Sequence, residues 1–222
     1  APAIVCADAD VERAADLLIA GKFRNAGQVC IAPTRFYVHE QVYEAFVQAF
    51  VERARRLTPG NGLHDGSSMG PLANPRRLQA MRTLIADAVE RGARVECGGQ
   101  AIAGPGFFWQ ATVLTNVPED ARAMNEEPFG PLALINRVQS VDEAIERANR
   151  LPYGLAGYAI TQDRATRMQL ARGLQTGMLG INSLHVSMPE APFGGVKESG
   201  WGSECGIEGL QAYCDIKLIS ED

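Results

Sequence analysis

The sequence contains no apolar run close to the ~20 residues that a membrane-spanning helix needs, and it does not open on a signal-peptide pattern. Basic residues are also sparse. The net charge is −5, and the longest arginine or lysine runs are the pairs Arg55-Arg56 and Arg76-Arg77. Nucleic-acid-binding proteins carry a basic footprint that is missing here. We therefore expect neither a membrane nor a nucleic acid as a partner.

The five cysteines form no C-x-x-C pair and share no metal-ligand spacing with the three histidines, which argues against a structural zinc site. Their odd number also fits poorly with a disulfide framework. A reducing compartment explains both features. We expect a soluble cytoplasmic protein without a metal.

The sequence has no initiator methionine and begins directly on a strand-like run, Ala1–Val5, so we expect it to be a fragment of a longer protein. No G-x-G-x-x-G follows a predicted strand, and no P-loop is present. If the protein binds a dinucleotide, most of that site must lie outside these residues.

Short β-branched or aromatic runs alternate with segments of helical periodicity. We predict strands at 2–6, 35–39, 95–97, 131–138, 155–161 and 178–182, helices at 10–20, 41–57, 75–90, 140–150 and 163–173, and extended segments at 107–113 and 212–220. Strands that alternate with helices favour an α/β fold with a doubly wound, mostly parallel sheet and helices on both faces.

The stretch Gly27-Gln28-Val29-Cys30 places a cysteine in a short polar segment between a predicted helix and a predicted strand. A thiol in an apolar core is inert, because burial raises its pKa. On a loop that enters a helix, backbone N–H groups lower the pKa of a thiol and can hold an oxyanion. Cys30 is therefore a candidate nucleophile, and a structural core cysteine is the alternative.

Three motifs together resemble the aldehyde dehydrogenase superfamily: Gly27–Cys30, the run Glu127-Pro128-Phe129-Gly130-Pro131, and the run from Pro192 to Gly200. They occur in the family's order, and the resemblance extends over the whole chain as the C-terminal, catalytic-domain portion of such an enzyme. It implies a catalytic domain at 1–208 and a tail at 209–222 that contributes an oligomerisation strand to a homo-oligomer.

The resemblance also implies a covalent mechanism on Cys30. The thiolate attacks an aldehyde, a hydride passes to NAD or NADP, and water hydrolyses the thioester to a carboxylic acid. Glu127 would accept hydrogen bonds from the nicotinamide ribose, and Phe129 would pack near the nicotinamide; a merely solvated carboxylate is the alternative for Glu127. The family's general-base glutamate and oxyanion asparagine would lie upstream of Ala1, so we expect the fragment alone to be inactive.

Three segments near the motifs, Lys22-Phe23-Arg24-Asn25, Gly180-Ile181-Asn182 and Val186-Ser187, resemble the succinate-semialdehyde dehydrogenase branch. In that branch Arg24 and Ser187 would hold the far carboxylate of the substrate. A guanidinium binds a carboxylate through two parallel hydrogen bonds, and a hydroxyl adds one donor. A surface charge for Arg24 and an ordinary loop serine for Ser187 are the alternatives. Glutarate or 2-oxoglutarate semialdehyde, or an uncharged aldehyde, also remain open as substrates.

The third motif and Asn182 are assigned structural roles. The glycines of the third motif permit the positive φ of a tight bend that shapes the substrate tunnel, and we expect Lys197 to face solvent. Asn182 is expected to form a turn.

Two rival functions remain. Cys30 and His185 would suit a Cys/His hydrolase, which needs an orienting Asn or Asp and no cofactor. The chain would otherwise be a catalytically silent fragment that only folds and associates.

Overall fold

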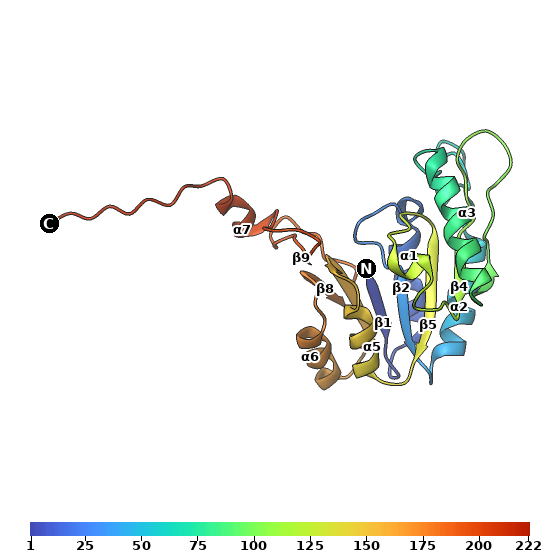
Figure 1. Ribbon diagram of the computed structural model, residues 1–222, viewed down its shortest axis with the longest axis horizontal. Helices are drawn as coiled ribbons and strands as arrows, with labels where there is room; N and C mark the ends of the chain where they lie inside the picture. The colour runs from blue at the N-terminus through green and yellow to red at the C-terminus, as the bar shows by residue number, and fades with distance from the viewer.

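The computed structural model describes residues 1–222, and its strands alternate with helices (Figure 1). The strands are β1 (Pro2–Val5), β2 (Arg35–His39), β3 (Arg94–Cys97), β4 (Thr112–Thr115), β5 (Leu132–Val138), β6 (Tyr153–Gly154), β7 (Ala156–Ile160), β8 (Met178–Ile181) and β9 (Val196–Lys197). The helices are α1 (Val11–Phe23), α2 (Tyr43–Arg56), α3 (Pro75–Glu90), α4 (Arg122–Asn125), α5 (Val141–Asn149), α6 (Arg164–Gly173) and α7 (Gly206–Gln211), with a short 3-10 turn, η1 (Arg24–Gly27). None of the helices combines the length and the apolar character needed to cross a membrane.

Seven strands form one sheet in the order β3-β4-β5-β2-β1-β7-β8, and β6 pairs with β9 apart from it. Every neighbouring pair in the large sheet is parallel except β3 and β4. The chain starts in the middle of the sheet, builds one side through β2 to β5, and then crosses to the other side of β1 for β7 and β8. The predicted doubly wound, mostly parallel sheet is confirmed.

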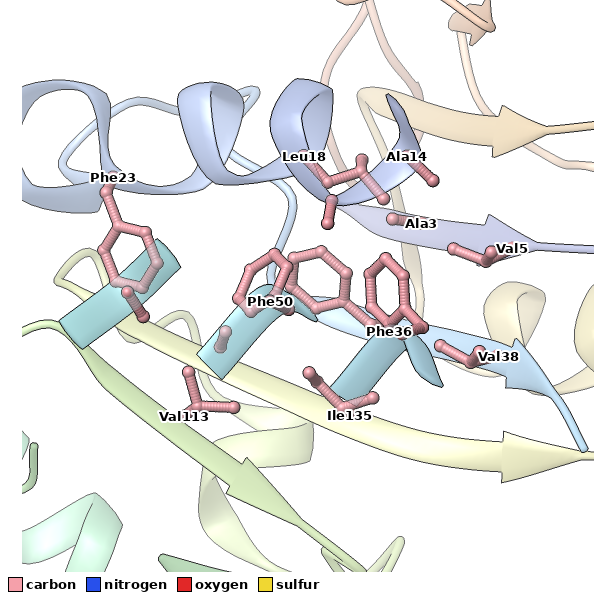
Figure 2. Close-up of a cluster of buried hydrophobic side chains, with 14 of the residues drawn as sticks. Ala3, Val5, Ala14, Leu18, Phe23, Phe36, Val38, Phe50, Val113 and Ile135 are labelled. Carbon is pink, nitrogen blue, oxygen red and sulfur yellow. The ribbon is translucent and has the colours of Figure 1, made fainter. Parts of the chain in front are cut away.

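Helices cover both faces of this sheet because successive residues of a strand point to opposite faces. Ala3 and Val5 of β1 belong to a core shared with α1 and α2, whereas Ile4 belongs to a second core shared with α3, α5 and α6. Figure 2 shows the first core, in which the rings of Phe36 and Phe50 meet edge to face with centroids 5.2 Å apart.

Two side-chain contacts fix the ends of helices that matter for the site. Phe23, the last residue of α1, packs against Phe50 at 6.2 Å between ring centroids (Figure 2). It thereby anchors the point from which the Cys30 segment leaves the helix. At the start of α5, the Ser140 hydroxyl accepts from the Glu143 amide at 3.1 Å, and the Glu143 carboxylate accepts from the Gln139 amide, so serine and glutamate cap this helix end together.

The structure differs from the predictions in its short elements. The segment expected to be extended at 107–113 contributes only a bridge at Trp109, and the strand lies at Thr112–Thr115. No sequence pattern predicts the helices α4 and α7 or the pair β6–β9. The tail after α7 pairs with no strand of this chain and runs away from the sheet (Figure 1).

Candidate active site

A cavity of about 610 Å³ lies at the edge of the sheet where the parallel strands begin. Its walls include residues at or just before the starts of β1, β2, β5 and β7, and both Cys30 and Glu127 are among them. Open parallel sheets commonly bind ligands beyond the opposite, carboxyl ends of their strands. In this chain the candidate site therefore depends on the segments that lead into the strands.

The segment between α1 and β2 begins with strained backbone. Asn25, Ala26 and Gly27 have φ values of 51°, 53° and 71°, in the left-handed region that side chains disfavour. Such conformations cost about 1–3 kcal/mol each for non-glycine residues and persist only where surrounding contacts impose them. Buried Ala26 and the packing of Phe23 supply contacts of this kind. The turn reverses the chain and brings Cys30 back toward the sheet.

The first two residues of the nucleophile motif hold this turn in place. A Cβ atom on Gly27 would lie 2.1 Å from the carbonyl oxygen of Gly130, so only glycine fits where the first and second motifs touch. The Gln28 side chain donates to the carbonyl of Pro71 at 3.2 Å and accepts from the amide of Ala73 at 2.8 Å. The long loop after α2 thus braces the segment that carries Cys30.

Cys30 is exposed, forms no disulfide and is the second residue of a tight turn, in which the amide of Ala32 donates to the carbonyl of Val29 at 2.9 Å. This placement agrees with a nucleophile and contradicts the alternative of a core cysteine. The next element after the turn is the strand β2, however, so Cys30 does not lie at the start of a helix. Within this chain, any backbone N–H donors near the thiol come from the turn and not from a helix terminus.

The second motif faces the same cavity. Glu127 and Phe129 both line it, and the exposed Glu127 carboxylate makes no hydrogen bond or ion pair within the chain. A hydrogen bond from α3 holds the backbone of the motif, because the Arg77 guanidinium donates to the carbonyl of Pro128 at 3.1 Å. Free acceptors on a fixed backbone are what a diol ligand requires.

Lys22 lies beneath the site, although no motif singles it out. Its side chain is 0% exposed, and its ammonium donates to the Thr34 hydroxyl at 3.3 Å. Burial lowers the pKa of Lys22 to about 7, and the charge of Glu127 opposes this shift. Helical spacing could have indicated from the sequence that Lys22 is buried. Lys22 follows the fully buried Leu18 by four residues on α1 and therefore shares its inward face.

Arg24 is exposed beside the site and does not line the cavity. Burial raises the pKa of the Tyr158 hydroxyl to about 12; the charge of Arg24 acts to lower this pKa, and Cys30 acts to raise it. Arg24 and Cys30 thus lie near the same hydroxyl, and the guanidinium has no carboxylate partner in the chain.

Ser187 and His185 lie on the exposed segment after β8, and neither lines the cavity. The segment is anchored near the end of α1, where a Cβ on Gly21 would lie 2.9 Å from the Leu184 side chain. The structure therefore brings the Ser187 segment to the end of α1 that carries Arg24, without placing Ser187 in the cavity. It supplies no Cys30–His185 pair, which disfavours the hydrolase alternative.

The third motif forms β9 and the bend before it. A Cβ on Gly177 would lie 2.0 Å from the carbonyl oxygen of Gly194, so the bend packs tightly on the start of β8. Lys197 is exposed, as expected, and its ammonium also donates to the carbonyls of Asn149 and Leu151 at 2.8 and 3.0 Å. Cations suit the carbonyl end of a helix, here α5.

Asn182 has a φ of 55°, in keeping with the predicted turn, and its amide side chain also bonds to both backbone groups of Thr161 at 3.0 and 2.7 Å. It therefore ties the ends of β7 and β8 together.

Comparison with known proteins decides the family. Residues 1–219 match the aldehyde dehydrogenase family. The chain belongs to that family. The resemblance inferred from the three motifs is confirmed, and each motif contributes a residue to the wall of the same cavity: Cys30, Glu127 and Ser199.

Several aldehyde dehydrogenase relatives are similar over nearly the whole chain. The putative 4-(hydroxymethyl)benzenesulfonate dehydrogenase TsaD2 of Comamonas testosteroni is 47% identical over 219 residues, which are 99% of this chain and 46% of that protein. The NADP(+) succinate-semialdehyde dehydrogenase GabD of Escherichia coli (strain K12) is 41% identical over 219 residues, 99% of this chain and 45% of that protein. The crystal structure of succinate-semialdehyde dehydrogenase from Burkholderia pseudomallei superposes with a TM-score of 0.93 at 41% identity, over 96% of this chain and 44% of that one. The chain thus spans about half the length of these relatives.

Proposed function

We propose that this chain carries the catalytic cysteine of an NAD(P)-dependent aldehyde dehydrogenase, which oxidises an aldehyde to a carboxylic acid. The observation that supports it most is a single cavity lined by Cys30, Glu127 and Phe129. These three residues come from two motifs about a hundred residues apart in the sequence, and each has the chemistry that such a reaction needs.

Cys30 supplies the nucleophile. Its sulfur forms a bond to the aldehyde carbon, and the carbonyl oxygen becomes an oxyanion that a backbone N–H of the turn can stabilise. NAD or NADP, when bound, accepts the hydride that the same carbon loses. The thioester that remains on Cys30 is hydrolysed by water, which releases the acid and regenerates the thiol. The chain spans about half the length of its relatives, and we propose that the family's general base and oxyanion asparagine lie upstream of Ala1, so that the chain acts only together with that segment.

Glu127 and Phe129 would hold the reacting end of the cofactor. The Glu127 carboxylate offers acceptors only, and none is engaged within the chain, which suits the two hydroxyls of a ribose. Phe129 presents an aromatic ring in the same cavity, where it can pack against the nicotinamide.

The substrate class follows from Arg24. We propose an aldehyde with an anionic group at its far end, with succinate semialdehyde as the first candidate. Arg24 has an unpaired guanidinium near the Tyr158 hydroxyl, and Ser187 would add a hydroxyl donor. The names of the relatives include both a carboxylated and a sulfonated compound. A guanidinium binds either anion.

Two alkylating reagents test this substrate class directly on the chain. Iodoacetate and iodoacetamide react with thiols by the same displacement, but only iodoacetate carries a carboxylate. The rate of Cys30 alkylation by iodoacetate divided by the rate with iodoacetamide, measured on the peptide that contains Cys30, should fall about threefold in Arg24→Gln. A nearby charge at a solvated site contributes roughly 1 kcal/mol or less. Arg164→Gln is the matched control, since Arg164 is exposed on α6 and makes no ion pair. An unchanged ratio in Arg24→Gln would argue against an anionic substrate.

Aldehyde oxidation itself is tested with a polypeptide that includes the upstream segment. We expect NADH or NADPH to form with succinate semialdehyde, and no turnover after Cys30→Ser. The 222-residue chain alone should show no turnover. Turnover by this chain alone would contradict the proposal that part of the active site lies on the upstream segment.

We further propose that residues 209–222 carry an oligomerisation strand and that the protein is a cytoplasmic dimer or tetramer. In this tail Tyr213, Ile216 and Leu218 are 91%, 103% and 91% exposed. Apolar side chains of a strand need a partner to cover them. Light scattering should find that a chain ending at Gln211 loses the assembly that the whole chain forms; equal masses for the two would contradict the proposal.

A further inference from the structure

The turn that carries Cys30 is held by two side-chain hydrogen bonds, one from a distant strand and one from a residue just beyond the turn. The carbonyls of Ile31 and Ala32, the two residues after Cys30, each accept one side-chain hydrogen bond. The donors are Tyr158 and Thr34. Ile31 and Ala32 are the third and fourth residues of the turn, so the two bonds fix the peptide groups on either side of Ala32 and restrain the turn that carries Cys30.

Tyr158 lies in β7 and is 2% exposed. Its hydroxyl donates to the carbonyl of Ile31 at 2.8 Å, across 127 residues of sequence. The ring has little freedom to move, because it packs so closely on β8 that a Cβ on Gly180 would lie 3.1 Å from it. Burial raises the pKa of Tyr158 to about 12, so the hydroxyl keeps its proton at neutral pH and stays a donor.

Thr34 holds the next carbonyl. Its hydroxyl donates to the carbonyl of Ala32 at 3.2 Å and accepts from the buried Lys22 ammonium at 3.3 Å. The Thr34 hydroxyl has one proton, which it gives to the Ala32 carbonyl, and its lone pairs are left to accept from the Lys22 side chain. Lys22 thus orients Thr34, which in turn orients the turn.

We propose that Tyr158 and Thr34 are positioning residues for the nucleophile, which clamp the carbonyls of Ile31 and Ala32 so that the Cys30 sulfur faces the cavity. The inference rests on the proposed role of Cys30. It adds two residues that belong to none of the three motifs and that do not themselves react.

The test is the rate at which iodoacetamide alkylates Cys30 in the whole chain, with the exposed Cys205 as internal reference. Tyr158→Phe and Thr34→Val each remove one hydroxyl at nearly constant volume. We expect each to slow Cys30 about fivefold relative to Cys205, the change that one hydrogen bond of ordinary strength carries. Thr34→Ser keeps the hydroxyl and should restore the rate.

Tyr43→Phe is the matched control. Tyr43 lies in the same core, and its hydroxyl donates to the carbonyl of Ile135 at 3.4 Å, away from the turn. The inference is overturned if Cys30 reacts at the wild-type rate or faster in Tyr158→Phe and Thr34→Val, or if Tyr43→Phe slows it equally. Because iodoacetamide is uncharged and no cofactor takes part, this result is independent of whether the protein oxidises an anionic aldehyde.

Discussion

At Gly27 the backbone of the motif that contains Cys30 touches the backbone of the motif that contains Glu127. The motif requires glycine twice over: the φ of 71° disfavours any side chain, and the carbonyl of Gly130 occupies the space that a Cβ would take. Gly130 in turn packs against Met81 of α3. The two halves of the cavity are therefore positioned by small residues that take no part in the chemistry.

Gly27→Ala should lower the free energy of unfolding by roughly 3 kcal/mol or more, since it adds both backbone strain and a clash with another backbone segment. Chemical denaturation measures this loss. Gly62→Ala is the control: a Cβ on Gly62 would have no other atom within 4 Å, and the substitution should change stability by no more than about 0.5 kcal/mol. Equal stability of Gly27→Ala and the wild type would mean that the two motifs can separate without cost.

At the scale of elements, the sequence predicts long periodic segments well and short ones badly. The helices α2, α3 and α5 and the strands β2 and β5 follow from apolar spacing and from caps such as Ser140, because their signals lie within the element itself. The pair β6–β9 has no such signal, since its two strands of two residues exist only through contacts between distant segments. The same holds for the site: the motifs identify Cys30 and Glu127, whereas the role of Tyr158 depends on a contact that no local pattern records.

The link between β9 and α5 gives a prediction at this scale. Lys197→Met removes both hydrogen bonds to the carbonyls of Asn149 and Leu151, so the β6–β9 pair should open more often. We expect amide hydrogen exchange at Gly154 and Val196 to accelerate about fivefold, as the loss of about 1 kcal/mol implies. Lys217→Met, in the unpaired tail, should leave the exchange of both amides unchanged. Unchanged exchange in Lys197→Met would show that the strand pairing alone holds the third motif.

For the molecule as a whole, the buried Lys22 makes folding depend on pH. Its pKa is about 7 in the folded chain against 10.5 as the ordinary value, so between these pH values unfolding takes up a proton. The free energy of unfolding therefore rises with pH across this window, by up to ~1.4 kcal/mol per pH unit, and the contribution is lowest below pH 7, where both states are charged. Above about pH 9 the buried Cys6 acts in the opposite direction, because burial raises its pKa from 9.0 to about 12.

The substitution Lys22→Met isolates the contribution of Lys22 to the pH dependence of the free energy of unfolding. The variant has no proton to take up, so it should be more stable than the wild type at pH 7, where a charged lysine is costly to bury. The difference in stability should shrink as the pH rises toward 9, because the free energy of unfolding of the wild type increases with pH and that of the variant does not. Denaturation of both proteins at several pH values measures the difference, and Lys217→Met should follow the wild type throughout. Parallel curves for Lys22→Met and the wild type would mean that Lys22 keeps an ordinary pKa in the folded chain, so that its ammonium must reach water and is not sealed beneath the Cys30 turn.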